Sequence, residues 1–185
     1  MNLGCVLLAS GLARRFGRNK LLEEFGGKTL AERTLDAIPG DLFSKIVTVT
    51  AYDEIEAMAR ARGFCTLRNT QPQRGIGSTI KLGVALMEGT DACMICVCDQ
   101  PYISENTLRR MIANYSGGIV AVAFGKQRGN PVLFPGDLYG ELLAIEDGRS
   151  GSSVIERHGD MLTLFNTGSK RELMDVDFVD DIDRF

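Results

Sequence analysis

Four short segments that are apolar along almost their whole length constrain this chain most. They run from Gly4 to Ser10, from Lys45 to Ala51, from Ala92 to Cys98 and from Ile119 to Phe124. A strand with one face in water alternates apolar and polar residues, whereas these segments are apolar at successive positions. That pattern is typical of parallel strands whose two faces are both covered.

Longer segments with helical periodicity separate these strands. We expect helices over Leu30–Ile38, Asp53–Arg62, Thr79–Met87 and Glu105–Tyr115. Ser104 ahead of Thr107 indicates a helix start, and Asp53 with Glu56 resembles a capping box. Alternating strands and helices predict a three-layer α/β fold, in which helices cover both faces of a mostly parallel sheet.

The last third of the chain is less regular. Asn130-Pro131, Pro135-Gly136 and Asp147-Gly148 are turn signals. We interpret this part as an elaboration of the same domain that includes a short antiparallel piece. The length of 185 residues, of which 44% are hydrophobic, suits a single domain over residues 1–185.

Charge and hydrophobicity exclude several classes of partner. The formal net charge of -3 leaves no basic field for nucleic acid. The longest apolar runs are far shorter than the roughly 20 residues that span a bilayer, so no membrane partner is expected. The N-terminus lacks the pattern of a secretory signal, and five cysteines without framework spacing suit a reducing compartment. We therefore expect a cytoplasmic protein.

The loop after the first strand carries small residues and then four cations. Ser10 and Gly11 would let backbone N–H groups approach an anion, and Arg15 and Lys20 would supply charge. Phosphate binding and a solvated basic turn both remain open from this spacing. The glycine spacing excludes the dinucleotide fingerprint, and the residues around Lys20 exclude a P-loop.

This loop resembles the Leu-Ala-Ala-Gly-x-Ser-x-Arg-Met-Gly-x-x-Lys motif of the MobA-like nucleotidyltransferases, which transfer NMP from an NTP with Mg²⁺. The matching residues are Leu8, Ala9, Gly11, Arg15, Gly17 and Lys20, while Ser10 replaces the second alanine. The resemblance implies a Rossmann-like nucleotidyltransferase fold. It also implies that residues 8–11 cradle the nucleotide while Arg15 and Lys20 contact its phosphates.

An aspartate stands at the end of the third apolar segment, in Asp99-Gln100-Pro101. A carboxylate where a buried strand emerges can hold a divalent cation that bridges phosphates, although an aspartate in such a turn is more often a cap. The sequence resembles the Cys-Asp-Gln-Pro element of the same family, with Cys98 included. The resemblance implies that Asp99 binds Mg²⁺.

Three further segments extend the resemblance over nearly the whole chain. Residues 69–78 resemble a nucleotide-contacting segment, in which Asn69, Gly75 and Ser78 would act. Residues 128–134 resemble Arg-Gly-His-Pro-Val-Leu-Phe, with Asn130 in place of histidine. Residues 175–182 resemble an acidic terminal motif, so that Asp175, or Asp177 as its rival, would be a second metal ligand; a solvated acidic tail is equally compatible.

The subfamily that the chain resembles most is the molybdenum cofactor cytidylyltransferases, on the strength of Gln100. The expected reaction transfers CMP from CTP to a phosphorylated pterin, with Gln100 and Asn130 at the acceptor. A molybdenum hydroxylase or its maturation factor would be a transient partner. Where the family has Gly-Asp-x-Gly-Ala-Arg, this chain has Arg149 and Ser153 in place of the acid and the base. Guanylyl transfer, transfer to a sugar or alcohol phosphate, and a non-catalytic binding role therefore stay open.

Two other groups of residues are interpreted as structural. Cys96 and Cys98 share one face of their strand and Cys93 takes the other, so the three thiols cannot converge on a metal. His158 is the only histidine, and we expect it at a helix end without a catalytic partner.

Overall fold

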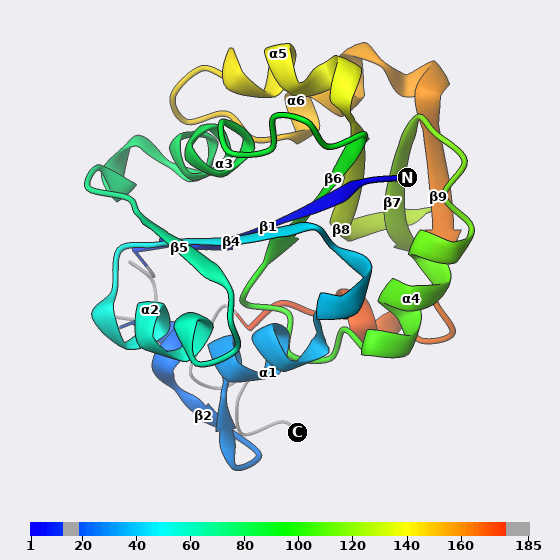
Figure 1. Ribbon diagram of the computed structural model, residues 1–185. Coiled ribbons are helices and arrows are strands. Elements are labelled where there is room, and N and C mark those ends of the chain that lie inside the picture. Colours follow the sequence, from blue (N-terminus) through cyan, green and yellow to red (C-terminus); the bar gives the residue numbers. More distant parts are fainter. Residues whose placement is uncertain (13–18, 177–185) are drawn as a thin grey trace.

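A seven-stranded sheet forms the centre of the computed structural model, which describes residues 1–12 and 19–176 (Figure 1). The strand order is β5-β4-β1-β6-β8-β7-β9. The strands are β1 (Leu3–Ala9), β4 (Lys45–Thr50), β5 (Cys65–Arg68), β6 (Ala92–Val97), β7 (Ile119–Phe124), β8 (Gln127–Pro135) and β9 (Leu162–Asn166). All four predicted strands are present, each within one residue of the predicted ends.

The sheet is mostly parallel. Strand β1 pairs in parallel with β4 and β6, β4 pairs with β5, and β7 pairs with β9. Strand β8 alone is antiparallel to both of its neighbours, and it is longer than the short piece expected from the sequence.

The turn predicted at Asn130-Pro131 is wrong, because both residues lie inside β8. The pairing of β8 with β6 begins only at Val132, and the register with β7 shifts between Ala121 and Ala123. Proline cannot donate a ladder hydrogen bond, and an irregularity of this kind is where a strand accommodates it.

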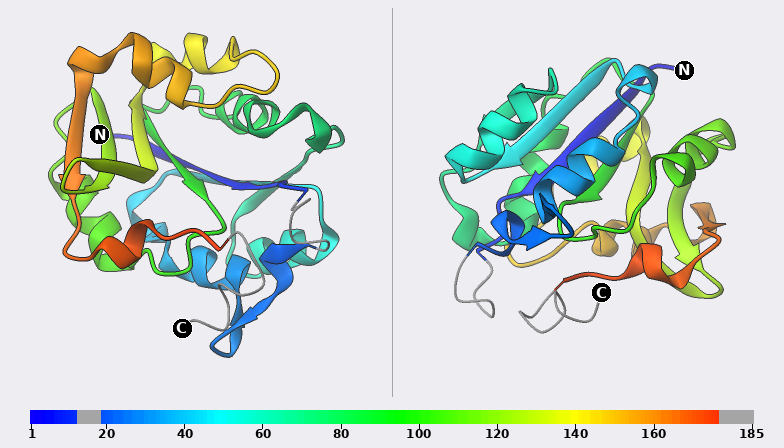
Figure 2. Two further views of the ribbon diagram at one scale, coloured as in Figure 1. Left: turned by 180° about the vertical axis from the view of Figure 1, so that it is seen from behind. Right: turned by 90° about the horizontal axis from the view of Figure 1, so that it is seen from below.

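Helices cover both faces of the sheet, as predicted (Figures 1 and 2). One face carries α1 (Leu30–Ala37), α2 (Asp53–Arg60) and α4 (Glu105–Ala113), and the other carries α3 (Ile76–Val84), α5 (Tyr139–Leu143) and α6 (Ser152–Arg157). Strand β1 is buried at every position. Leu7 packs into the apolar core on the side of α1, α2 and α4, and Leu8 packs into the core on the side of α3, α5 and α6. Two separate apolar layers therefore explain why the strand has no polar face.

The helix ends differ in part from expectation. Ser104 caps α4 by accepting a hydrogen bond from the Thr107 N–H, as predicted. The capping box expected at Asp53 is wrong, because Tyr52 is the N-cap of α2 and its side chain makes no capping bond. A capping box does occur at Thr29 and Glu32, at the start of α1.

Helix α3 begins at Ile76, three residues before the predicted start. Its N-cap, Gly75, has a φ of +87°, a conformation that glycine adopts without strain. Two-residue strands β2 (Glu24–Phe25) and β3 (Lys28–Thr29) form a separate hairpin. Within the described ranges no helix is both long enough and apolar enough to cross a membrane.

The packing of α3 on β1 leads to a stability prediction. A Cβ added at Gly83 would lie 2.2 Å from Cγ1 of Val6, which belongs to the buried strand. We expect Gly83→Ala to lower the free energy of unfolding by about 1–3 kcal/mol, because the close-packed core cannot yield. Urea denaturation would measure this change.

The matched control is Gly140→Ala in α5, where a Cβ would meet no atom of the described part of the chain within 4 Å. It should leave the stability unchanged or raise it by up to about 1 kcal/mol through helix propensity. Equal effects of the two substitutions would contradict the assigned contact between α3 and β1.

Candidate active site

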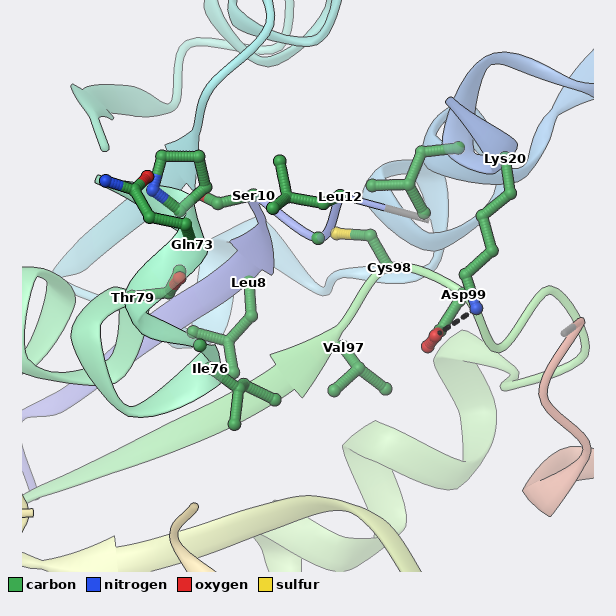
Figure 3. A pocket seen from close by; sticks show the side chains of 14 residues that line it. Leu8, Ser10, Leu12, Lys20, Gln73, Ile76, Thr79, Val97, Cys98 and Asp99 are labelled. Carbon is green, nitrogen blue, oxygen red and sulfur yellow. Dashed lines mark ion pairs between the residues drawn. The ribbon is translucent and has the colours of Figure 1, made fainter. Parts of the chain in front are cut away.

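A pocket of about 380 Å³ opens at the carboxyl ends of β1 and β6 (Figure 3). Ligands of open α/β sheets bind at this edge. The pocket is lined by the end of β1, the loop that follows it, residues 72–79 and the end of β6. Its lining residues are Leu8, Ser10, Gly11, Leu12, Lys20, Leu21, Pro72, Gln73, Gly75, Ile76, Thr79, Val97, Cys98 and Asp99.

Lys20 and Asp99, which the resemblance assigns to the phosphates and to Mg²⁺, meet in this pocket. The Lys20 Nζ atom lies 2.9 Å from Asp99 Oδ2, and the two side chains are 14% and 26% exposed (Figure 3). Asn19 holds the short turn that carries Lys20 by accepting a hydrogen bond from the Leu21 N–H. A cation and a carboxylate are thus placed together where an anionic ligand can enter.

The end of β1 is braced from the neighbouring strand. The Ser10 hydroxyl donates to the Val49 carbonyl at 3.0 Å, and the Tyr52 hydroxyl donates to the Gly11 carbonyl at 2.8 Å. A Cβ at Gly11 would meet no atom of residues 1–12 and 19–176 within 4 Å, so the absent side chain leaves space with respect to those residues. These bonds fix the loop backbone at a point where a ligand can approach it closely. Ala9, predicted with this set, is fully buried in the core on the α1 side and does not line the pocket.

Asn69 and Ser78 support the pocket without lining it. The Asn69 amide donates to the hydroxyls of Ser78 and Thr79, and its Oδ1 accepts from the Gln71 N–H. The Ser78 hydroxyl donates to the Gly75 carbonyl at 2.8 Å. Both side chains are buried and engaged within the protein, so their place in the structure is to hold the turn around Gly75.

An ion pair fixes the same turn from outside. Arg74 donates two hydrogen bonds to the Asp147 carboxylate, at 2.8 and 3.1 Å, and the Gly148 N–H donates to the Arg74 carbonyl. These hydrogen bonds from Arg74 hold the pKa of Asp147 below its usual value. Residues 71–75 are thereby tied to the segment between α5 and α6.

The segment that contains Asp175 runs beside the loop of Asp99 and Gln100. The Val176 N–H donates to the Asp99 carbonyl at 3.0 Å, and the Gln100 amide donates to Asp175 Oδ1 at 2.9 Å. No group of three or more histidine, cysteine or acidic side chains that could hold a metal occurs in the described part of the chain. Arg15, Gly17 and Asp177 lie outside the described residues.

A second hollow, of about 130 Å³, adjoins the first and shares Leu8, Ile76 and Val97 with it. Asn130 lines this hollow, and so does Arg128, whose guanidinium donates to the Ser152 hydroxyl at 3.1 Å. The remaining walls are largely aliphatic. Gln100, which was predicted to act together with Asn130, lines neither hollow.

The cysteines are arranged as predicted. Cys96 and Cys98 belong to the core beneath one face of the sheet and Cys93 to the core beneath the other. Burial, with a further contribution from the Asp99 charge, raises the pKa of the Cys98 thiol well above its ordinary value. Cys98 is therefore a neutral wall of the pocket at physiological pH. His158 ends α6 and pairs with Glu141, away from the pocket.

Sequence reasoning missed several residues of the site. Leu12 and Ile76 line the pocket although they are 40% and 41% exposed, and Tyr52 braces the first loop. Leu12 and Ile76 each adjoin a glycine of a predicted segment, which was an available signal. Tyr52 follows β4 directly, and only the pairing of β4 with β1 brings it to Gly11.

The chain is similar in sequence to known proteins. A family model described as MobA-like NTP transferase domain matches residues 5–162. A relative named nicotine blue oxidoreductase, from Paenarthrobacter nicotinovorans, is 26% identical over 97% of this chain and 94% of its own length. A probable molybdenum cofactor guanylyltransferase from Pyrococcus horikoshii is 34% identical over 49% of each chain.

A solved structure supports the fold. A nucleotidyl transferase from Methanothermobacter thermautotroptrophicus superimposes with a TM-score of 0.84 at 22% identity, over 99% of this chain and 95% of that one. A likeness at this identity concerns the fold, and it agrees with the mostly parallel sheet described above.

Proposed function

This chain belongs to the family of MobA-like NTP transferases, a family of nucleotidyltransferases, and on that premise we propose that it transfers CMP from CTP to molybdopterin and releases pyrophosphate. The observation that carries the proposal is the Lys20–Asp99 ion pair in the pocket at the ends of β1 and β6. A triphosphate needs a cation, and the metal ion that accompanies it needs a carboxylate.

The first pocket suits a nucleoside triphosphate. Lys20 would pair with phosphate oxygens, and the open side of Gly11 would admit them close to the backbone. Leu12 and Ile76 offer apolar surface to the base at the mouth of the pocket. Arg15 would add a second cation to the phosphates, a role that rests on the sequence motif alone.

Asp99 and Asp175 are the residues that would hold Mg²⁺. Magnesium in phosphate-transfer sites is bound by one or two carboxylates, with substrate phosphates and waters completing the octahedron, so this pair of acids fits the ion. When bound, the ion would neutralise charge that develops on the phosphates.

The second hollow suits the acceptor. Its aliphatic walls can lie against the faces of a flat heterocycle, while Arg128 and Asn130 present polar groups to the edge of that ring. It joins the first pocket along Leu8, Ile76 and Val97, so a phosphate carried by the acceptor can reach the triphosphate. We assign Asn130 to this acceptor site, and Arg128 with it.

In the proposed reaction, an oxygen of the acceptor phosphate attacks the α-phosphorus of CTP. The bond from that phosphorus to the bridging oxygen breaks, and pyrophosphate leaves with the electron pair. Because a phosphate nucleophile is already ionised, it needs no general base. The main barrier is repulsion between the anionic phosphates, which the positive charges of Lys20 and Arg15 would reduce.

The name of one relative raises oxidoreduction as a competing activity. The first loop of this chain lacks the three-glycine spacing of dinucleotide-binding proteins, and it delivers Lys20 to a carboxylate instead. These features favour nucleotidyl transfer. A non-catalytic carrier for a molybdenum hydroxylase or its maturation factor would not need the Asp99 carboxylate in this pocket.

The proposal is tested by incubating the protein with Mg²⁺, each of the four NTPs and either molybdopterin or a sugar or alcohol phosphate, and measuring pyrophosphate. We expect turnover with CTP and none when the acceptor is left out. Turnover with GTP alone would replace cytidylyl by guanylyl transfer, and turnover only with sugar or alcohol phosphates would replace the acceptor. No pyrophosphate with any NTP and any of these acceptors would contradict nucleotidyl transfer.

A further inference from the structure

The segment 170–176 packs along the loop 99–104 that follows β6. The Arg171 guanidinium lies 4.1 Å from the centre of the Tyr102 ring, and Glu172 accepts a hydrogen bond from the Ser104 hydroxyl at 2.9 Å. The Val176 N–H donates to the Asp99 carbonyl at 3.0 Å. Figure 2 shows the red segment on the side of the sheet that carries α1 and α4. Residues 170–176 are thus held against the loop that presents Asp99.

Gln100 belongs to the loop 99–104 and is almost fully buried, at 3% exposure. Its side chain borders a small closed space beside Thr34, Ile103 and Leu108, which is too small to admit water. It lines neither the nucleotide pocket nor the hollow around Asn130. A substrate in either hollow would therefore not touch the Gln100 side chain.

The Gln100 amide is instead directed at a carboxylate. Its Nε2 donates to Asp175 Oδ1 at 2.9 Å, while the neighbouring residue, Asp99, accepts the backbone bond from Val176. The backbone bond sets the path of the chain, and the amide bond reaches the Asp175 carboxylate itself. The amide donor helps to fix the orientation of that carboxylate.

We infer that Gln100 is a positioning residue that holds the Asp175 carboxylate beside Asp99 for a divalent cation, rather than a contact for the acceptor. This inference rests on the proposed function, because it assigns Asp175 to the metal. Groups that orient a metal ligand through a hydrogen bond typically change metal affinity or activity by about 10–100-fold when removed. Gln100 belongs to that class by its contacts.

The decisive variant is Gln100→Met, which keeps the length of the side chain and removes the donor. We would measure Mn²⁺ binding by electron paramagnetic resonance in the presence of CTP, without acceptor so that nothing turns over. The expected result is Mn²⁺ affinity about tenfold weaker than that of the wild type. With acceptor and Mg²⁺, kcat should fall while the KM for the acceptor stays within about twofold, since Gln100 touches no acceptor.

Two controls separate positioning from docking of the segment. Ser104→Gly removes the bond to Glu172 but leaves a residue that is accepted at a helix N-cap, so Mn²⁺ affinity should stay within about twofold. In an Asp175→Asn background, Gln100→Met should cause no further loss, because the group through which it acts is already changed.

Each outcome decides the inference. Wild-type affinity in Gln100→Met, an equal loss in Ser104→Gly, or full additivity with Asp175→Asn would overturn it. A raised KM for the acceptor with unchanged Mn²⁺ binding would restore Gln100 to the acceptor site. A wild-type protein that binds no Mn²⁺ would also overturn it. Mn²⁺ binding is measured without turnover. Failure of the transferase assay alone would therefore contradict the proposed function without affecting the comparison of Mn²⁺ affinities.

Discussion

Replacing Asp99 by asparagine is expected to lower kcat by about three orders of magnitude while the fold stays intact. Asparagine keeps the shape of the side chain and an oxygen that can accept from Lys20, but it removes the negative charge that would hold the metal. Stabilisation of transition-state charge by a metal amounts to several kcal/mol, and each 1.36 kcal/mol corresponds to about tenfold in rate. Pyrophosphate release under saturating NTP would measure the effect.

The matched control for this variant is Asp137→Asn, an exposed carboxylate before α5 that lines neither hollow. Its kcat should equal that of the wild type. The melting temperatures of both variants should lie close to that of the wild type, because Asp99 is partly exposed and its substitution creates no cavity. An Asp99→Asn protein that turns over within tenfold of the wild type would exclude Asp99 from the metal site.

Lys20→Met is expected to change two measurements in opposite directions. The kcat/KM for the NTP should fall by about 10²–10³-fold, the usual effect of removing one preorganised group that stabilises transition-state charge. Mn²⁺ binding without nucleotide should instead become tighter, because Lys20 Nζ now neutralises Asp99 Oδ2 at 2.9 Å and would no longer compete with the cation. Titration of Mn²⁺ followed by paramagnetic resonance would measure the second effect.

Lys28→Met serves as the control, since Lys28 forms an ion pair with Asp36 at the surface, outside both hollows. Neither kinetics nor Mn²⁺ binding should change in this variant. If Lys20→Met weakened Mn²⁺ binding instead, Lys20 would support the metal site rather than compete for it. The opposite signs of the two effects distinguish a charge in the site from a general loss of structure.

The strands that surround the site were predictable because they are buried on both faces. In β1, β4, β6 and β7, apolar residues at successive positions indicate that both faces of the strand are covered. Each of these strands was predicted within one residue of its observed ends. Strand β8 could not be recognised in the same way. It contains Gly129, Asn130 and Pro131, and these residues belong to a strand only because β6 and β7 pair with the rest of β8.

The meeting of Lys20 and Asp99 was predictable for a related reason. Each residue comes shortly after a buried strand, and the carboxyl ends of parallel strands meet at one edge of a sheet. A motif in sequence was therefore enough to place a cation and a carboxylate in the same region. Gly75, which was named from the resemblance of residues 69–78 to a family segment, lines the pocket. Asn69 and Ser78 were named from the same resemblance, but their hydrogen bonds are made within the protein.

The sequence alone determined the α/β class and the presence of an acid at the end of β6, because these depend on local composition and on the order of the strands. Only the tertiary structure decided that Gln100 faces Asp175 rather than Asn130, and that Tyr52 holds Gly11. The two partners of each bond are 75 and 41 residues apart in the chain. The direction of a buried polar side chain is set by which distant group can satisfy its hydrogen bond, and no local pattern records that choice.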